Sequence, residues 1–308
     1  MLSRVSNNLI WMSRYMERGY SILRLLKVNY SAHQDSQDLF SWEPIIKRYG
    51  NFNFTCASDN SADCINHMIF DNENLNAITN LVTKSRENAR SAQEHIPREL
   101  WLGINSYYLY LTAPALKQQL YENDPVVLLD KLLSYHLLHY GYMDITQERG
   151  PAYHFMNVGK FLERMIQILE ITSMKLTEVS KTNDELEQIF HWKNLLLSVG
   201  AYQLFLKKYK SNFKEEHIIR TIFNESLFPK SLYYCINKLS RHIDHLIKTN
   251  ELANNNLDFL LGKLGSTIKY TTTENIYHIG LDNFIYGIKN DIKQISLSIN
   301  DVYLTNKP

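Results

Sequence analysis

The chain has 308 residues, and its 33 Lys and Arg residues nearly balance its 32 Asp and Glu residues, giving a formal net charge of +1. This balance argues against a general nucleic-acid-binding protein, because such proteins need a strongly basic surface. Apolar residues make up 44% of the chain and charged residues 21%, which is typical of a globular protein and excludes an intrinsically disordered one.

The spacing of apolar residues predicts an all-α protein. The 11 Gly and 7 Pro residues are too few for a strand-rich fold, which needs frequent turns. Apolar residues recur at steps of three and four, and on this basis we expect helices at residues 5–30, 76–96, 98–122, 125–141, 152–178, 184–209, 215–224, 229–249, 256–270 and 275–303. Residues 50–64 are expected to form a loop, and residues 141–151 a turn-rich bridge.

The second half of the sequence resembles the first. Met12–Leu25 aligns with Val158–Ile171, and the two segments share a Glu-Arg pair and an Ile-Leu pair. Further matches follow in the same order, and the spacing between matched positions increases slowly along the chain, as one duplication with small insertions would produce. We therefore predict a helical bundle spanning residues 1–308, made of two similar halves, about 1–145 and 146–308, that pack about a pseudo-twofold axis.

Each of the two matching helices carries its Glu-Arg pair on the face opposite a broad apolar arc. The pairs are Glu17–Arg18 and Glu163–Arg164. Neighbouring residues on a helix point about 100° apart, so the two members of a pair do not face each other and their partners must lie elsewhere. Ser13 and Gly159, one turn earlier, are small enough to let another helix approach. We expect a central helix crossing that holds charged groups, with a solvated charged face as the alternative.

Arginine is concentrated in a few segments. The densest group lies at Arg86, Arg90 and Arg98. Arg86 and Arg90 share a helix face and repel each other unless an acidic group lies between them. Glu17 and Glu163 are candidate partners, and a ligand's carboxylate or phosphate is the functional alternative, since arginine binds such groups at two points. The candidate site comprises Arg14, Glu17, Arg18, Arg86, Glu87, Asn88, Arg90, Arg98, Glu99, Trp101, Lys160, Glu163 and Arg164.

Several ordered motifs resemble the bacterial Alpha-E domain family, a family of predicted all-helical proteins named for a Glu-Arg motif. The motifs are Met1–Val5, Trp11–Arg18, Ser85–Arg90, Glu99–Trp101, Gly159–Arg164, Ser198–Tyr202 and Phe228–Ser231. Two departures occur, because Gln147–Gly150 replaces the usual Arg-Asp-Glu-Gly and Lys160 replaces an Arg. The resemblance implies no settled activity, but it implies two partners, a circularly permuted ATP-grasp ligase and a transglutaminase-like cysteine peptidase.

The sequence shows no standard cofactor or metal motif. It has no phosphate-binding glycine loop, no nucleophile elbow and no Glu-x-x-His pattern of a di-metal bundle. His136 with His139, and His242 with His245, have a spacing that a metal could use, but ordinary histidines explain them better. We predict no cofactor and no metal.

The cysteines and the apolar runs indicate a cytoplasmic protein. Cys56, Cys64 and Cys235 have neither the spacing of a disulfide framework nor that of a zinc site. The sequence starts without an apolar export segment, and no apolar run reaches the roughly 18 residues of a membrane span. We expect a cytoplasmic location without membrane or nucleic-acid partners.

Three functional hypotheses follow from these observations. The first is an accessory or substrate-handling component of an ATP-grasp/transglutaminase-like peptide modification system, in which arginine clamps an acidic group of a peptide and glutamate orients it or receives an amine. The second is an enzyme that uses a glutamate of raised pKa as general base and arginine to stabilise an anion. The third is a non-catalytic scaffold whose Glu/Arg network holds the two halves in register. No catalytic motif decides among them.

Overall fold

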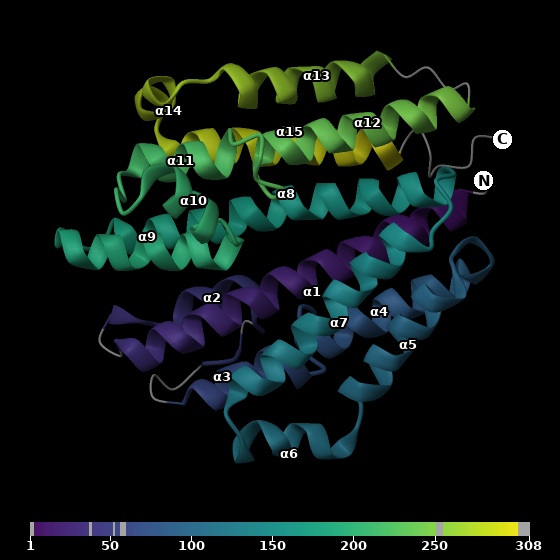
Figure 1. Cartoon of the computed structure of the whole chain (residues 1–308), viewed down its shortest axis with the longest axis horizontal. Helices are drawn as coiled ribbons and strands as arrows, with labels where there is room; N and C mark the ends of the chain where they lie inside the picture. Colours follow the sequence, from purple (N-terminus) through teal and green to yellow (C-terminus); the bar gives the residue numbers. More distant parts are fainter. Residues whose placement is uncertain (1–2, 37–38, 52, 56–59, 251–254, 301–308) are drawn as a thin grey trace. The chain divides into compact units, whose positions relative to one another are not determined.

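The computed structural model describes residues 3–36, 39–51, 53–55, 60–250 and 255–300, and this part of the chain contains fifteen α-helices and no strand (Figure 1). The prediction of an all-α fold is confirmed. The chain forms two compact units, one of residues 11–153 and one of residues 1–10 with 154–308. The prediction of a single domain built from two halves stays a prediction.

The unit of residues 11–153 is built on the long helix α1. Its helices are α1 (Ser3–Asp35), α2 (Glu43–Tyr49), α3 (Ser61–Phe70), α4 (Ile78–Ser91), α5 (Arg98–Leu111), α6 (Pro114–Glu122) and α7 (Pro125–Ile145). Helix α3 packs on α2, α4 and α6, and α5 packs on α4 and α7. Lys27 of α1 forms an ion pair with Asp130 of α7, and the Ser85 hydroxyl of α4 donates to the Met12 carbonyl at 3.2 Å. These contacts hold α1 against α4 and α7.

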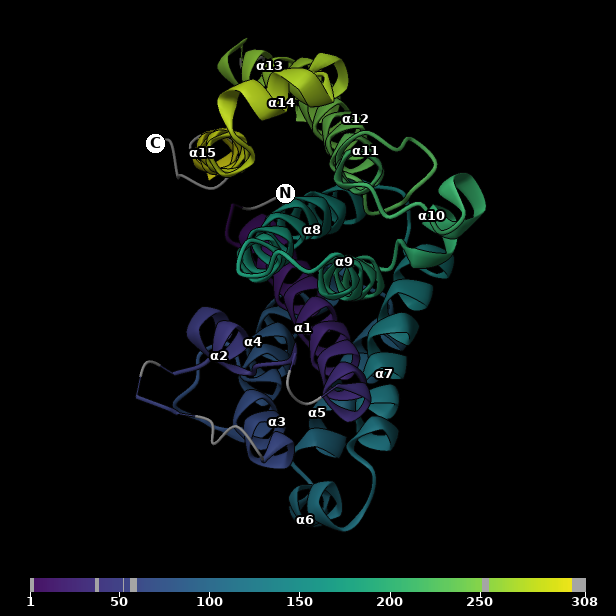
Figure 2. The same cartoon turned by 90° about the vertical axis from the view of Figure 1, so that its left-hand side faces the viewer.

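The unit of residues 1–10 and 154–308 is built on the long helix α8. Besides the start of α1, its helices are α8 (Pro151–Val179), α9 (Glu185–Val199), α10 (Tyr202–Tyr209), α11 (Glu215–Phe223), α12 (Leu232–Asn250), α13 (Asn255–Tyr270), α14 (Thr273–Ile279) and α15 (Leu281–Ile299). Helix α11 packs on α9, α12 and α14, and α13 contacts both α12 and α15 (Figure 2). Lys289 of α15 pairs with Glu170 of α8 at 2.9 Å. The helices of this unit follow the same succession of contacts as those of the other, with α10 inserted.

Polar caps explain where several helices begin. Asn60 accepts a hydrogen bond from the Asp63 N–H at the start of α3, and Asp184 accepts from the Leu186 and Glu187 N–H groups at the start of α9. Such side chains satisfy N–H groups that have no partner within the helix. The sequence therefore marks these helix starts through ordinary capping chemistry.

The predicted bounds of helices and connections needed five corrections. The segment 98–122 is two helices, because Pro114 starts α6 after a break at Thr112 and Ala113. The segments 184–209 and 275–303 are each split at a glycine with positive φ, Gly200 at 84° and Gly280 at 88°.

The other two corrections concern the predicted loop and bridge. The predicted loop 50–64 ends at Asn60, because Ser61 already begins α3. Neither α2 nor α3 is among the predicted helices. The predicted bridge 141–151 is also too long, because α7 continues to Ile145. Gly141 lies inside α7, where one glycine is tolerated at a cost of about 1 kcal/mol.

One cysteine departs from the sequence expectation. Cys64 is disulfide-bonded, whereas the cysteine spacing predicts no disulfide framework, so that prediction is wrong for this residue. Cys235 is free and buried on α12. Two thiols pair when the fold brings their Cβ atoms within about 4.5 Å, and spacing along the sequence does not reveal this distance.

Two features of the described residues concern membrane and metal binding. None of the helices there is both long and apolar enough to cross a bilayer. In the same residues, no group of three or more His, Cys, Asp or Glu side chains is arranged to hold a metal ion.

Candidate functional site

The two motif glutamates are completely buried. Glu17 lies in the unit of residues 11–153 and Glu163 in the other unit, and each has a relative exposure of 0%. Glu17 accepts a hydrogen bond from the Tyr140 hydroxyl at 2.6 Å, and Glu163 accepts one from the Gln167 amide at 2.9 Å. The alternative of a solvated charged face is therefore wrong for the glutamates.

A buried histidine and tyrosine pair lies on the α7 side of Glu17. The Tyr107 hydroxyl is 3.1 Å from His136 Nε2, and both side chains are buried. Burial lowers the pKa of His136 to about 3, with His139 adding to this effect and Glu17 opposing it. Burial also raises the pKa of Tyr107 well above 10. Both groups are thus neutral at physiological pH, so that Glu17 has polar but uncharged neighbours here.

The glycine at position 19 makes room for this histidine. A Cβ atom on Gly19 would lie 2.9 Å from His136 Cε1, closer than real Cβ contacts. The position of His136 therefore depends on the missing side chain of Gly19, which lies two residues after Glu17 on α1.

The motif arginines have corresponding places in the two units. Arg18 Nη1 donates to Asn76 Oδ1 at 3.5 Å, and Arg164 Nη1 donates to the Pro229 carbonyl at 3.3 Å. Asn76 lies in the connection that leads into α4, and Pro229 lies in the connection that leads into α12. Arg18 thus ties α1 to the segment that precedes α4, and Arg164 ties α8 to the segment that precedes α12.

The predicted close approach of a helix occurs at Gly159. A Cβ atom added there would overlap the Ile10 carbonyl oxygen and would lie 2.9 Å from the Ile10 carbonyl carbon. The N-terminal part of α1 therefore passes α8 with its backbone at this position, and only glycine fits. Ser13, the matching residue of α1, is buried, and its hydroxyl has no hydrogen-bond partner among the described residues.

Two further cations of the motif helices, Arg14 and Lys160, lie against aromatic rings. The Arg14 guanidinium is 4.4 Å from the Trp11 ring centroid, and Lys160 Nζ is 4.7 Å from that of Phe161. Both side chains are half-buried. Stacking of a cation on a neighbouring ring shields part of the side chain while leaving its charge near water.

Arg86 has an aromatic support of its own. Its Nε donates to Asn105 Oδ1 at 2.7 Å, and its guanidinium carbon lies 4.5 Å from the Tyr108 ring centroid and 5.8 Å from that of Trp101. We call Arg86, Trp101, Asn105 and Tyr108 the arginine platform. The expectation that Glu17 is the partner of Arg86 is wrong, because Arg86 donates its hydrogen bond to Asn105 of α5 instead.

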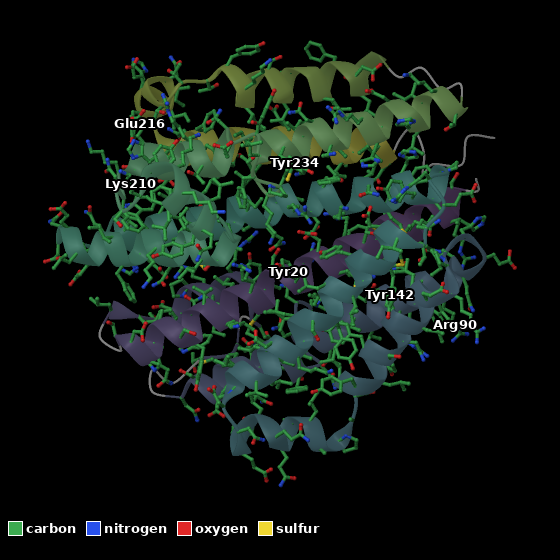
Figure 3. The ribbon with its side chains drawn as sticks, in the orientation of Figure 1. Tyr20, Arg90, Tyr142, Lys210, Glu216 and Tyr234 are labelled. Carbon is green, nitrogen blue, oxygen red and sulfur yellow. The ribbon has the colours of Figure 1, made fainter. Side chains whose placement is uncertain are left out.

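The remaining predicted residues do not join a buried cluster. Asn88 donates to the Lys84 carbonyl of its own helix at 2.9 Å. The side chains of four others are exposed, namely Glu87, Arg90, Arg98 and Glu99. Arg90 lies in the last turn of α4 (Figure 3). It is one turn from Arg86 and adds positive charge beside the arginine platform.

Sequence reasoning missed the hydrogen-bond partners of the glutamates and of Arg86. Gln167 lies four residues after Glu163, so helical spacing alone could have identified it. Tyr140 and Asn105 lie on other helices than Glu17 and Arg86, and their positions depend on how α7 and α5 pack.

A histidine pair connects α8 and α12. His154 Nδ1 and His242 Nδ1 are 2.9 Å apart, and the His154 ring stacks on His245. Burial lowers the pKa of His242 to about 3, and the charges of His154, Lys160, Lys238 and His245 lower it further. The His242 imidazole is thus neutral at physiological pH.

Comparison with known families gives one match. A family model named Alpha-E, described as a predicted alpha-helical domain with a conserved ER motif, matches residues 1–304. No curated protein and no solved structure matches the chain.

Proposed function

Because the chain belongs to the Alpha-E family, we propose that it is an accessory protein of a peptide modification system and that it binds an acidic group of the peptide substrate. The observation that carries this proposal is the arginine platform. Arg86 is half-buried, is held in one orientation by Asn105, and stacks on two aromatic rings.

A fixed guanidinium is well suited to bind a carboxylate. The hydrogen bond to Asn105 occupies Nε and leaves both Nη groups, and no acidic side chain pairs with Arg86 among the described residues. Two parallel N–H···O bonds from the Nη groups match the two oxygens of a carboxylate. Because the rings already restrict Arg86, binding loses less side-chain entropy than it would with a mobile arginine.

The proposed partners are an ATP-grasp ligase and a transglutaminase-like peptidase, as the family resemblance implies. In this proposal the partners form and trim the amide bond, and this chain presents the peptide. A cytoplasmic location belongs to the same proposal. The disulfide at Cys64 is the feature that weighs against this location, because disulfides seldom persist in a reducing cytosol.

We also propose that the two units descend from one duplicated half. The support is the matched succession of helix contacts and the equivalent places of Arg18 and Arg164. The pseudo-twofold packing of the halves remains part of this proposal.

The second candidate is a scaffold, which the buried glutamates favour. Glu17 and Glu163 are closed off from water, and each accepts a hydrogen bond from an uncharged side chain. Buried polar groups of this kind can specify one packing arrangement without any chemistry. As a scaffold, the protein would have no affinity for an acidic peptide.

Calorimetric titration with the dipeptide glutamyl-glutamate tests the proposal. We expect binding by the unmodified protein, a loss of at least about tenfold in affinity in Arg86→Ala, and a smaller loss in Arg86→Lys, which keeps the charge but not the two-point geometry. Arg241→Ala is the matched control, because Arg241 is the exposed counterpart of Arg86 in the repeat.

Two results would contradict the binding role. One is the absence of any dipeptide binding, and the other is an equal loss of affinity in Arg86→Ala and Arg241→Ala. Peptide ligation by the two partner enzymes, with and without this chain, then measures the accessory role. An unchanged reaction would leave the scaffold as the better description.

A further inference from the structure

A cavity of about 700 Å³ lies within the unit of residues 1–10 and 154–308, and its lining includes neither a motif glutamate nor a residue of the arginine platform. The last turn of α8, the first half of α9, the connection 211–214 and the first turns of α11 and α15 line it. This volume is in the range that accepts a small molecule or the end of a peptide.

One wall of the cavity is apolar. Trp192 of α9 lines it with an exposure of only 4%, and Ile189 lies almost one turn earlier on the same helix. A ring held this firmly provides a flat apolar surface without loss of side-chain freedom on binding. This wall is suited to an aliphatic group.

The charged side chains of the lining are three carboxylates and one amine. Glu185, Glu215 and Asp282 lie in the first turns of α9, α11 and α15, and Lys214 precedes α11. None of these four side chains forms a hydrogen bond or an ion pair with another described residue. Acidic residues in a first turn commonly offset the helix dipole, which accounts for the exposed Glu185 and Asp282.

Glu215 differs from the other two carboxylates, because it is half-buried without a partner. Burial raises the pKa of its carboxyl group, and the same carboxyl helps raise the pKa of Tyr277. A carboxylate that loses water and gains no donor is destabilised. A cation bound in the cavity would remove this destabilisation.

Hydrogen-bond donors complete the lining. Neither Lys214, which precedes α11, nor Gly280, which precedes α15, caps its helix with a side chain. The first N–H groups of both helices therefore have no side-chain acceptor, and such groups bind oxygen atoms readily. The cavity thus offers an acceptor for a cation, donors for carbonyl oxygens and an apolar wall.

We propose that this cavity binds the amino terminus of a peptide. The ammonium group lies at Glu215, the first side chain packs on Trp192, and the peptide carbonyl oxygens accept from the N–H groups that begin α11 and α15. This site is independent of the arginine platform, so each can fail while the other holds.

Calorimetry with three amides tests the proposal. Leucinamide carries the amine and the aliphatic side chain, N-acetylleucinamide lacks the amine, and glycinamide lacks the side chain. We expect leucinamide to bind, and the other two to bind at least about tenfold more weakly. Below the raised pKa of Glu215, leucinamide affinity should fall, since the neutral carboxyl attracts an ammonium group less.

Two glutamate variants on the same turn give a matched comparison. Glu215→Gln should weaken leucinamide binding by about tenfold or more and remove its pH dependence. Glu216→Gln should change neither, because Glu216 lies outside the cavity lining and pairs with Arg220 at 3.3 Å. If Glu215→Gln lowers the melting temperature, Asp282→Asn replaces it, with a smaller expected loss of affinity.

Three results would overturn the proposal. The first is no leucinamide binding at millimolar concentrations. The second is equal affinity for leucinamide and N-acetylleucinamide. The third is the same affinity in Glu215→Gln and Glu216→Gln.

Discussion

The glutamates of the two Glu-Arg helices share their burial, but each accepts one side-chain hydrogen bond from a different kind of place. Glu17 and Glu163 both have no exposed surface, yet Glu17 accepts from a tyrosine of α7 and Glu163 from a glutamine of its own helix. Both arrangements give the carboxyl group an uncharged donor. The comparison teaches that a buried carboxyl of this motif can accept a side-chain hydrogen bond from its own helix or from another one.

The small residues of the two helices differ in a second way. Gly159 faces the backbone of α1 at Ile10, where no Cβ atom fits. Ser13 occupies the matching place on α1 and already carries a Cβ atom and a hydroxyl. Only one of the two small residues is therefore required by close packing within its unit.

The largest expected effect comes from Gly159→Ala. The added methyl group overlaps the Ile10 carbonyl, so the unfolding free energy should fall by about 3 kcal/mol or more. This loss would occur although alanine favours the helix by about 1 kcal/mol over glycine. Ser13→Ala should change the unfolding free energy by less than about 0.5 kcal/mol. Urea unfolding followed by circular dichroism measures both, and equal effects would contradict the comparison.

The second effect concerns pH and the two buried histidines. The pKa values of His136 and His242 are about 3 in the folded protein, below the ordinary 6.5. Above pH 6.5 both imidazoles are neutral in the folded and in the unfolded chain, so their lowered pKa values do not reduce the unfolding free energy there. Below pH 6.5 each of these histidines binds a proton in the unfolded chain but not in the folded chain. Between pH 6.5 and pH 5 the unfolding free energy should therefore fall by about 2 kcal/mol for each histidine.

The causes of the two shifts separate the histidines. Burial dominates both, but neighbouring cations, including Lys238, also act on His242. Lys238→Met should therefore raise the pKa of His242 and leave that of His136 unchanged. Histidine titration by NMR checks the pKa values, and urea midpoints at pH 7 and pH 5 check the stability. A pH-independent midpoint would show that the folded protein protonates both rings.

The third and smallest effect concerns the donors to the motif glutamates. Tyr140→Phe should lower the unfolding free energy by about 2 kcal/mol and Gln167→Met by about 1 kcal/mol. The tyrosine bond is shorter, 2.6 Å against 2.9 Å, and it joins two helices. Tyr142→Phe is the control on α7, because no described residue forms a hydrogen bond with its hydroxyl. If Tyr140→Phe and Tyr142→Phe have the same urea midpoint, the Tyr140 hydrogen bond does not stabilise the protein and the prediction is wrong.

Much of the helical pattern could be predicted from periodicity, and the failures have specific causes. Helix α2 spans only seven residues and α3 only ten, which is too short for a clear apolar repeat. Three predicted helices ran through Pro114, Gly200 and Gly280, where apolar residues continue on both sides but the backbone turns. Apolar spacing identifies helices better than it identifies the breaks between consecutive ones.

The candidate site was predicted only as a set of motifs. The sequence singled out Glu17, Glu163 and Arg86, and it grouped them because charges in one motif set suggested one cluster. The structure assigns Glu17 to Tyr140 and Arg86 to Asn105. Partners on other helices depend on packing angles that local spacing does not contain.

The sequence by itself determined the helical class, the repeated Glu-Arg pattern and the family, because periodicity, repetition and motif order are properties of the chain. Only the tertiary structure decided that both glutamates are buried, that Gly159 meets a backbone, and that Arg86 rests on Trp101 and Tyr108. The physical reason is that burial and partner choice arise from contacts between helices far apart in sequence. A helix's own pattern shows which face is polar, but it does not show what lies against that face.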